Sequence, residues 1–181
     1  HQLHGQAMRE GMVLKALHVN HQIHPQALEW AWHCQHVCDA LQVPLVIETV
    51  GNIQRLPGES LEMWARKARY DAFQRHVQSQ DILFLAHHAD DQAETFLYRL
   101  MRGAGLEGLG AMAEETTRLG ITIRRPLLQT TRAEIAAYAG LHQLSFIDDP
   151  SNLDVSYDRN YLRHQVIPAL YARWPSATQK I

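Results

Sequence analysis

Asp81-Ile-Leu-Phe-Leu-Ala86 runs directly into His87-His-Ala-Asp-Asp-Gln-Ala-Glu-Thr95, and this junction points to the architecture of the whole chain. The apolar run predicts a strand, and the polar segment after it opens a helix from Asp90 to Arg102. A strand that passes straight into a helix is the repeating unit of parallel sheets, whose ligands bind beyond the carboxyl ends of the strands. Two histidines and three carboxylates are therefore expected at a ligand crevice.

Similar alternation continues on both sides of this junction. Strands are expected over 13–19, 44–48, 81–86 and 121–124, helices over 25–41, 59–78 and 90–102 and from 131, and a loop over 50–58. Apolar strands separated by helices indicate a sheet that is covered on both faces. The sequence therefore predicts an α/β fold of the doubly wound class with a mainly parallel sheet.

Size and composition narrow the class of protein. With 181 residues, 46% of them hydrophobic, the chain favours one domain over 1–181, and about 145–181 forms its closing helical segment. The net charge of -2 means that the chain as a whole carries no excess of positive charge, so any nucleic-acid contact must be local. No apolar run reaches the roughly 18 residues that a membrane span needs. The two cysteines are too few for a disulfide framework, which favours a reducing, cytoplasmic location.

The acidic residues at the helix start carry the strongest functional signal. Asp91 and Glu94 are three apart and share a helix face, and Asp90 also reaches Glu94. One acidic cap would explain a single carboxylate, but three in so short a span repel each other unless a cation intervenes. Because Mg²⁺ binds one or two carboxylates together with phosphates, it is the cation expected among these three acids.

Two pairs of arginines have an ambiguous meaning. Arg66 and Arg69 are three apart, and Arg159 and Arg163 are four apart, so each pair shares a helix face. Guanidinium groups suit phosphate oxygens, but spacing alone favours an ordinary solvated face. The role of His87 is also open among metal binding, base stacking and a plain strand end.

Two further patterns are set aside. Gly103-Ala-Gly-Leu-Glu-Gly108 matches a dinucleotide fingerprint but follows a helix instead of a strand. The cysteines Cys34 and Cys38, with His33 and His36 among them, match no standard zinc spacing, and their helical stripe favours packing.

Taken together, several motifs resemble the tRNA(Ile)-lysidine synthase family of PP-loop ATPases. They are Leu17-His-Val-Asn-His21, Ala65-Arg-Lys-Ala-Arg-Tyr70, the segment 87–95, Arg102-Gly-Ala-Gly-Leu-Glu-Gly-Leu-Gly-Ala-Met112, Arg125-Pro-Leu-Leu128, Ile147-Asp-Asp-Pro-Ser-Asn152 and Arg159-Asn-Tyr-Leu-Arg-His164. The resemblance spans essentially the whole chain and implies the adenine nucleotide alpha hydrolase-like fold. It also implies that ATP adenylates the first anticodon cytidine of tRNA(Ile) with a CAU anticodon, after which L-lysine displaces AMP.

The resemblance also implies roles for individual residues. ATP would contact His18, Val19, Asn20, Arg69, His87 and Asp90, whereas Asp91, Glu94, Arg66 and Arg159 would serve catalysis, with Mg²⁺ on Asp91 and Glu94. Asp91 is the first choice and Glu94 the second for the group that accepts the proton of the lysine amine.

One departure from the family concerns its phosphate-binding loop, Ser-Gly-Gly-x-Asp-Ser. The chain opens inside the helix that this loop introduces, so we expect a fragment without the first strand and with impaired activity. Two alternatives stay open: a non-catalytic nucleotide- or RNA-binding remnant, and another PP-loop enzyme that modifies tRNA, such as a thiolase.

Overall fold

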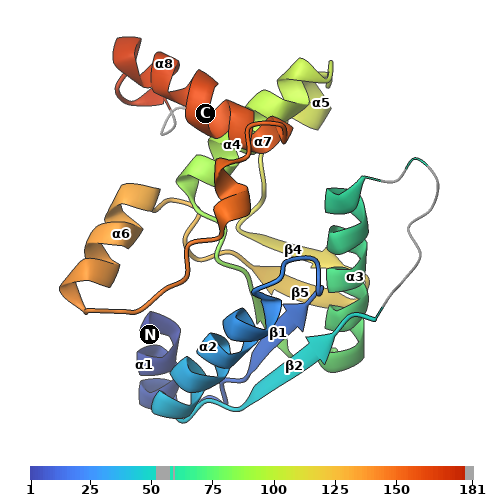
Figure 1. Ribbon diagram of the computed structural model, residues 1–181, viewed down its shortest axis with the longest axis vertical. Coiled ribbons are helices and arrows are strands. Elements are labelled where there is room, and N and C mark those ends of the chain that lie inside the picture. Colours follow the sequence, from blue (N-terminus) through green and yellow to red (C-terminus); the bar gives the residue numbers. More distant parts are fainter. Residues whose placement is uncertain (52–57, 59, 178–181) are drawn as a thin grey trace. The chain divides into compact units, whose positions relative to one another are not determined.

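The computed structural model describes residues 1–51, 58 and 60–177. These residues form two compact units, His1–Gln78 and Ser79–Ile181 (Figure 1). Most of the loop predicted over 50–58 lies outside the described residues. The single domain predicted over 1–181 stays a prediction.

The first unit alternates helices and strands, as its sequence pattern predicts. Its elements are α1 (Gln2–Glu10), β1 (Ala16–Asn20), α2 (Ala27–Ala40), β2 (Leu45–Thr49) and α3 (Leu61–His76). Strands β1 and β2 are parallel, with Ala16 opposite Leu45. Helix α1 ends at Gly11, whose φ of 65° is left-handed and costs glycine little.

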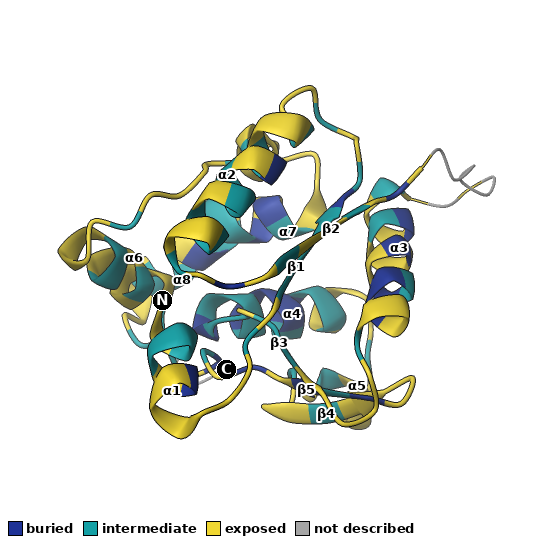
Figure 2. Cartoon of the chain, turned by 90° about the horizontal axis from the view of Figure 1, so that it is seen from below, coloured by how far each residue is buried: buried dark blue, intermediate teal, exposed yellow. Residues whose placement is uncertain are grey.

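Helix α3 packs one face into this unit. Its residues Trp64 and Ala68 form a buried cluster with Val50, which follows β2, and Val19 of β1 packs against them. Figure 2 shows buried and exposed residues side by side along α3, as expected of a helix with one covered face. The cluster therefore holds α3 beside the carboxyl ends of both strands.

The second unit contains a mixed three-stranded sheet. Its elements are β3 (Ile82–Phe84), α4 (Ala89–Met101), α5 (Leu106–Leu109), β4 (Glu115–Arg118), β5 (Ile121–Arg124), α6 (Arg132–Leu141), a 3-10 turn (Pro150–Leu153), α7 (Asp158–Tyr161), a π turn (Leu162–Val166) and α8 (Ile167–Arg173). The strand order is β3-β5-β4, with β3 parallel and β4 antiparallel to β5. The helical segment predicted over about 145–181 thus consists of several short helical pieces.

Two expectations for the strands need correction, and one strand was not expected. The strand predicted over 81–86 has only three residues, and Ile82 is 40% exposed, so it is shorter and less buried than its composition suggested. The first strand begins at Ala16 instead of Val13, which is exposed. Strand β4 was not predicted, because its polar sequence Glu-Thr-Thr-Arg lacks an apolar pattern.

A tight turn explains how β4 forms. Leu119 and Gly120 connect β4 to β5 with φ values of 53° and 78°. Positive φ at both central residues is the geometry that joins two antiparallel strands with the correct twist. Glycine at position 120 was the signal for this hairpin in the sequence.

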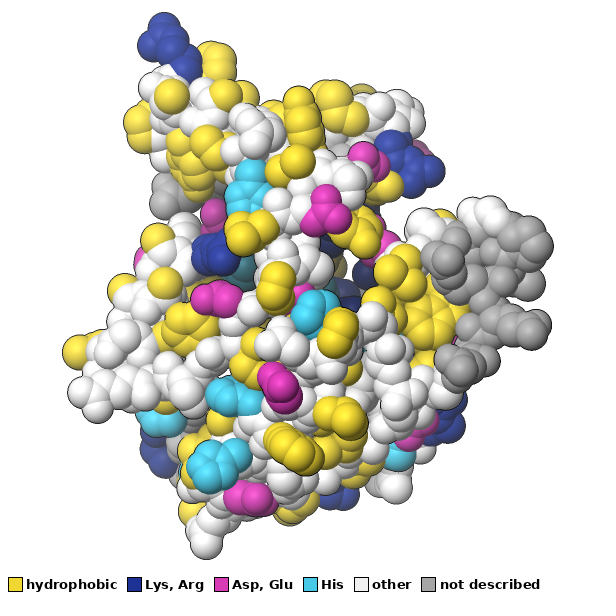
Figure 3. Space-filling view, in the orientation of Figure 1, with side chains coloured by type: hydrophobic (Ala, Val, Ile, Leu, Met, Phe, Trp, Pro, Cys, Tyr) yellow, Lys and Arg dark blue, Asp and Glu magenta, His cyan; other side chains and the backbone are white. Residues whose placement is uncertain are grey.

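The second unit buries its core between α4 and the C-terminal helical pieces. Ala93 and Leu97 of α4 contact Leu162 and Ile167, all with at most 8% of their surface exposed. Within the described residues, no helix is long and apolar enough to cross a membrane. On the face drawn in Figure 3, acidic and basic side chains of the described residues lie interspersed.

The capping box predicted at Thr131 is present and provides a test of the α6 boundary. The Thr131 Oγ1 atom accepts from the Glu134 backbone N–H at 3.2 Å, and the Glu134 carboxylate accepts from the Thr131 N–H at 2.7 Å. We expect Thr131→Ala to lower the free energy of unfolding by about 1 kcal/mol, measured by urea denaturation. Thr130→Ala, one residue outside the box, is the control. Equal losses in both variants would contradict the cap.

Candidate functional site

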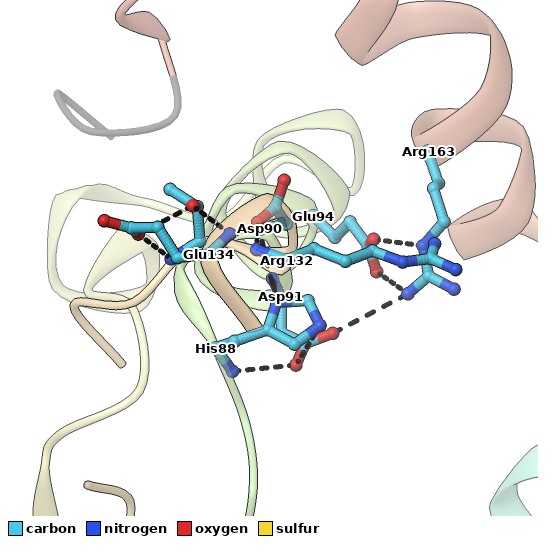
Figure 4. A network of polar contacts seen from close by, with 8 residues as sticks. His88, Asp90, Asp91, Glu94, Arg132, Glu134 and Arg163 are labelled. Carbon is cyan, nitrogen blue, oxygen red and sulfur yellow. Dashed lines mark hydrogen bonds and ion pairs between the residues drawn. The ribbon is translucent and has the colours of Figure 1, made fainter. Parts of the chain in front are cut away.

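The start of α4 is fixed by a reciprocal pair of hydrogen bonds between His88 and Asp91. The His88 backbone N–H donates to Asp91 Oδ2 at 2.9 Å, and the Asp91 N–H donates to His88 Nδ1 at 3.4 Å (Figure 4). The other ring nitrogen of His88, Nε2, lies 3.6 Å from Asp91 Oδ2. One oxygen of Asp91 is therefore committed to capping the helix.

Asp90 joins the starts of two helices. Its Oδ2 atom accepts from the backbone N–H of Arg132, the first residue of α6, at 2.8 Å. The Ala89 N–H donates to the Thr130 carbonyl at 2.9 Å beside it. A carboxylate at a helix N-terminus is favoured by the helix dipole, so Asp90 braces α4 against α6.

Glu94 forms a two-pronged ion pair with Arg163. Arg163 donates from Nε to Oε1 at 2.6 Å and from Nη2 to Oε2 at 3.0 Å, and the Glu94 side chain is only 1% exposed. The same guanidinium lies 3.6 Å from Asp91 Oδ1, and the Asp91 side chain is 15% exposed. Figure 4 shows Arg163 reaching both carboxylates from the C-terminal helical segment.

The charges at this site are strongly coupled. Burial raises the pKa of Glu94, and the hydrogen bonds and positive charge of Arg163 oppose that shift, with a further contribution from Arg159. Burial also works against the charge on Arg163, but its hydrogen bonds to Glu94 and the charges of Glu94, Asp91 and Asp90 outweigh it and raise the pKa of Arg163. The cation that the three carboxylates require is thus provided, at least in part, by Arg163.

A π turn accounts for the place of Arg163 in the helix. The Ile167 N–H donates to the Leu162 carbonyl, five residues back instead of four. Pro168 follows at once, and it has no N–H to donate to the residue four positions before it. This irregularity was not predicted, although Pro168 was the signal for it in the sequence.

A basic cluster occupies the carboxyl end of β1 in the first unit. Burial, together with the charges of Arg69 and His18, lowers the pKa of His21. Burial and the nearby charge of Arg66 lower the pKa of Arg69. The predicted residues His18 and Arg69 therefore each lie close enough to His21 for their charges to act on it, and Arg66 lies close enough to act on Arg69.

Two of the residues predicted to border ATP have structural partners of their own. The Asn20 side chain is buried; it accepts from the Gln22 N–H at 2.9 Å and contacts the Ala27 carbonyl at 3.4 Å, fixing the turn into α2. His18 Nδ1 lies 3.5 Å from Cys34 Sγ, and burial raises the pKa of that thiol. Their predicted contacts with ATP stay predictions.

The predicted residues fall into two groups, one in each unit. The first unit holds His18, Val19, Asn20, Arg66 and Arg69, and the second holds His87, Asp90, Asp91, Glu94 and Arg159. Within the described residues, no group of three or more His, Cys, Asp or Glu side chains is arranged to hold a metal ion.

Sequence reasoning left two residues of the second unit without a role. His88 caps α4, and Arg163 pairs with Glu94, whereas Arg159 was the arginine chosen. A histidine just before an acidic helix start was the available signal for the cap.

The chain is similar in sequence to tRNA(Ile)-lysidine synthases of several bacteria. The chain is 51% identical over 168 residues to a tRNA(Ile)-lysidine synthase of Xanthomonas axonopodis pv. citri, covering 93% of the chain and 38% of the relative. It is 51% identical over 165 residues to that of Pseudomonas fluorescens, covering 91% and 36%. It is 47% identical over 161 residues to that of Haemophilus influenzae, covering 89% and 37%. The chain thus spans about 37% of the length of that last relative.

The fold and the family agree. The U34-tRNA thiolase NcsA of Methanococcus maripaludis superposes with a TM-score of 0.74 at 15% identity, over 93% of this chain and 59% of the thiolase, and this likeness concerns the fold alone. The expected α/β architecture with parallel strands is confirmed. Residues 1–170 match the family model described as the PP-loop domain. The chain therefore belongs to the PP-loop domain family.

Proposed function

We propose that this chain is the catalytic PP-loop part of a tRNA(Ile)-lysidine synthase. In the reaction, the carbonyl oxygen of the first anticodon cytidine attacks the α-phosphorus of ATP and releases pyrophosphate. The amine of L-lysine then displaces AMP and forms the carbon-nitrogen bond of lysidine. The observation that carries the proposal is that Asp91 and Glu94, on the helix that follows β3, meet Arg163 of the π turn, in a chain about half identical to such enzymes.

The two carboxylates suit different roles. Both oxygens of Glu94 accept hydrogen bonds from Arg163, and its side chain is almost fully buried, so Glu94 holds Arg163 in place. Asp91 Oδ2 accepts a hydrogen bond from the His88 N–H at 2.9 Å. Asp91 Oδ1 lies farther from its neighbour, 3.6 Å from Arg163 Nη2. We assign to Asp91 Oδ1 the acceptance of the lysine amine proton, since a base must have a lone pair within reach of its substrate.

The first unit offers partners for a nucleotide. His21 Nδ1 and Trp64 Nε1 are buried without a hydrogen-bond partner among the described residues, and their rings lie 5.9 Å apart. A buried donor and a buried nitrogen that lack partners suit the polar edge of a purine base. The neighbouring cations Arg66 and Arg69 suit its phosphates, so the residues fit ATP.

The donor set at α4 is compatible with Mg²⁺. This ion takes one or two carboxylates and completes its shell with phosphate oxygens and water, so Asp91 would hold it while ATP is bound and would accept the amine proton only in the later lysine step. When bound, Mg²⁺ would neutralise charge on the phosphates. Arg163 and Arg159 contribute positive charge at Glu94 without it.

The alternative of a sulfur-transferring PP-loop enzyme receives less support. Such enzymes often rely on reactive cysteines near the site, and burial raises the pKa of both Cys34 and Cys38. A raised thiol pKa disfavours the thiolate that sulfur chemistry needs. A non-catalytic binding remnant stays an outcome of the test below.

A chimeric enzyme tests the proposal. Residues 1–170 of this chain replace the matching segment of the Escherichia coli O157:H7 tRNA(Ile)-lysidine synthase, which is 48% identical to it over 165 residues. We expect the chimera to incorporate radiolabelled lysine into a tRNA(Ile) transcript with a CAU anticodon, and to require ATP. The unmodified relative is the positive control. A chimera that folds and binds tRNA but transfers no lysine would favour the non-catalytic reading.

A further inference from the structure

We infer that Pro168 is a positioning residue, because it maintains the π turn over Leu162–Val166 that directs Arg163 onto Glu94. Inside an α-helix, the proline ring clashes with the carbonyl four residues before it, which here belongs to His164. Widening the helix by one residue per turn moves that carbonyl away. The five-residue hydrogen bond from Ile167 to Leu162 is this widening.

An ordinary reading would place Pro168 in the first turn of a new helix, where proline is tolerated. The backbone argues against a new start. Leu162 has φ -56° and ψ -47°, and Ile167 has φ -60° and ψ -42°, so both residues are helical across the junction. Pro168 therefore lies within one continuous helical stretch from Asp158 to Arg173, where only an altered turn accommodates it.

Core packing shows what the π turn achieves. Leu162 and Ile167 both belong to the cluster around Ala93 and Leu97. Five residues along an α-helix amount to about 500°, which would leave the two side chains about 140° apart. The wider turn lets both face α4. Leu162 packs against Ala93 in this cluster. The next residue of each helix is Arg163 and Glu94, so the same packing brings these two side chains together.

The electrostatic consequence follows from burial. Arg163 is the partner of a carboxylate with 1% of its side chain exposed, so a change in the direction of Arg163 leaves Glu94 without its counter-charge. Pi turns recur at functional sites because they redirect a side chain without ending the helix. Pro168 acts only through Arg163, and the relevance of this to catalysis rests on the proposed function.

The test measures the coupling between Glu94 and Arg163 in the 181-residue chain. Urea unfolding of Glu94→Gln, Arg163→Met and the double variant gives their coupling free energy, with Pro168 present and with Pro168→Ala. Pro168 is exposed, so its replacement removes little packing. We expect Pro168→Ala to reduce the coupling by more than half. Pro126→Ala, at another exposed proline, is expected to leave the coupling unchanged.

A second readout follows Arg163 itself. In the native chain the Arg163 Nε–H should exchange slowly with solvent in NMR spectra, and in Pro168→Ala this protection should be lost. A variant that is less stable but keeps the coupling and the slow Nε–H would overturn the inference. Failure of Pro168→Ala to fold would overturn it too, because Pro168 would then be needed for folding itself. Neither measurement uses tRNA or ATP, so both are independent of whether the chimera makes lysidine.

Discussion

Arg163→Met is expected to lower the free energy of unfolding by about 3–5 kcal/mol at pH 7, because it leaves a buried carboxylate without its partner. Glu94 is 1% exposed, and Arg163 provides both hydrogen bonds to its oxygens. Urea denaturation, followed by circular dichroism, measures the loss. Methionine keeps much of the length of the arginine stem, so the change isolates the charge and the hydrogen bonds.

The loss should depend on pH in a defined direction. Burial already raises the pKa of Glu94, and removal of Arg163 raises it further. A carboxyl whose folded pKa lies above its unfolded value of about 4.3 contributes stability that is complete below that pH and is lost as pH rises through the folded pKa. The deficit of Arg163→Met should therefore be largest near neutrality and should shrink toward pH 5.

A matched double variant separates charge from packing. Glu94→Leu combined with Arg163→Met replaces the buried pair with two apolar side chains, and it should recover most of the stability that Arg163→Met loses. A deficit in Arg163→Met that is flat between pH 5 and pH 8, or a double variant as unstable as the single one, would argue against a buried, ionised Glu94.

Asp91→Asn in the chimeric enzyme is expected to reduce lysidine formation by about 10²–10⁴-fold while tRNA binding survives. The amide has nearly the shape of the carboxylate and its Oδ1 can still accept the hydrogen bond from the His88 N–H, but it cannot take a proton from the lysine amine. Lysine transfer is measured with radiolabelled lysine, and tRNA binding by filter retention.

Two controls define what the loss means. Asp158→Asn removes an exposed carboxylate at the start of α7 and should leave lysine transfer within about twofold of the chimera, as surface changes away from special contacts have small effects. Glu94→Gln should reduce transfer together with stability, because Glu94 acts by holding Arg163. Full transfer by Asp91→Asn would remove Asp91 from the role of proton acceptor.

Local signals in the sequence predicted the helices well. The capping box at Thr131 sets the first residue of α6, and the acidic run after His88 sets the start of α4, since both depend on residues next to each other in sequence. The strands were harder. Val13 is apolar but lies outside β1, because pairing with β2 begins only at Ala16.

The partner of Glu94 could not be identified from spacing. Arg159 and Arg163 share one face of a regular helix, so their spacing does not say which of them reaches Glu94. The sequence predicted Mg²⁺ among the carboxylates, and this stays a prediction, whereas the guanidinium of Arg163, 69 residues from Glu94 in sequence, provides positive charge there. Long-range pairing of this kind leaves no periodic trace in a sequence.

The two sheets end in strands that have only one hydrogen-bonded neighbour among the described strands. Strand β1 pairs only with β2, and β3 pairs only with β5, so each leaves a row of N–H and C=O groups to satisfy elsewhere. An unpaired edge strand can pair with a strand of another chain, and charged side chains beside the edge disfavour this pairing. Lys15 immediately precedes β1 and Asp81 immediately precedes β3. A charge beside the border of each sheet disfavours the pairing of a second chain with that strand.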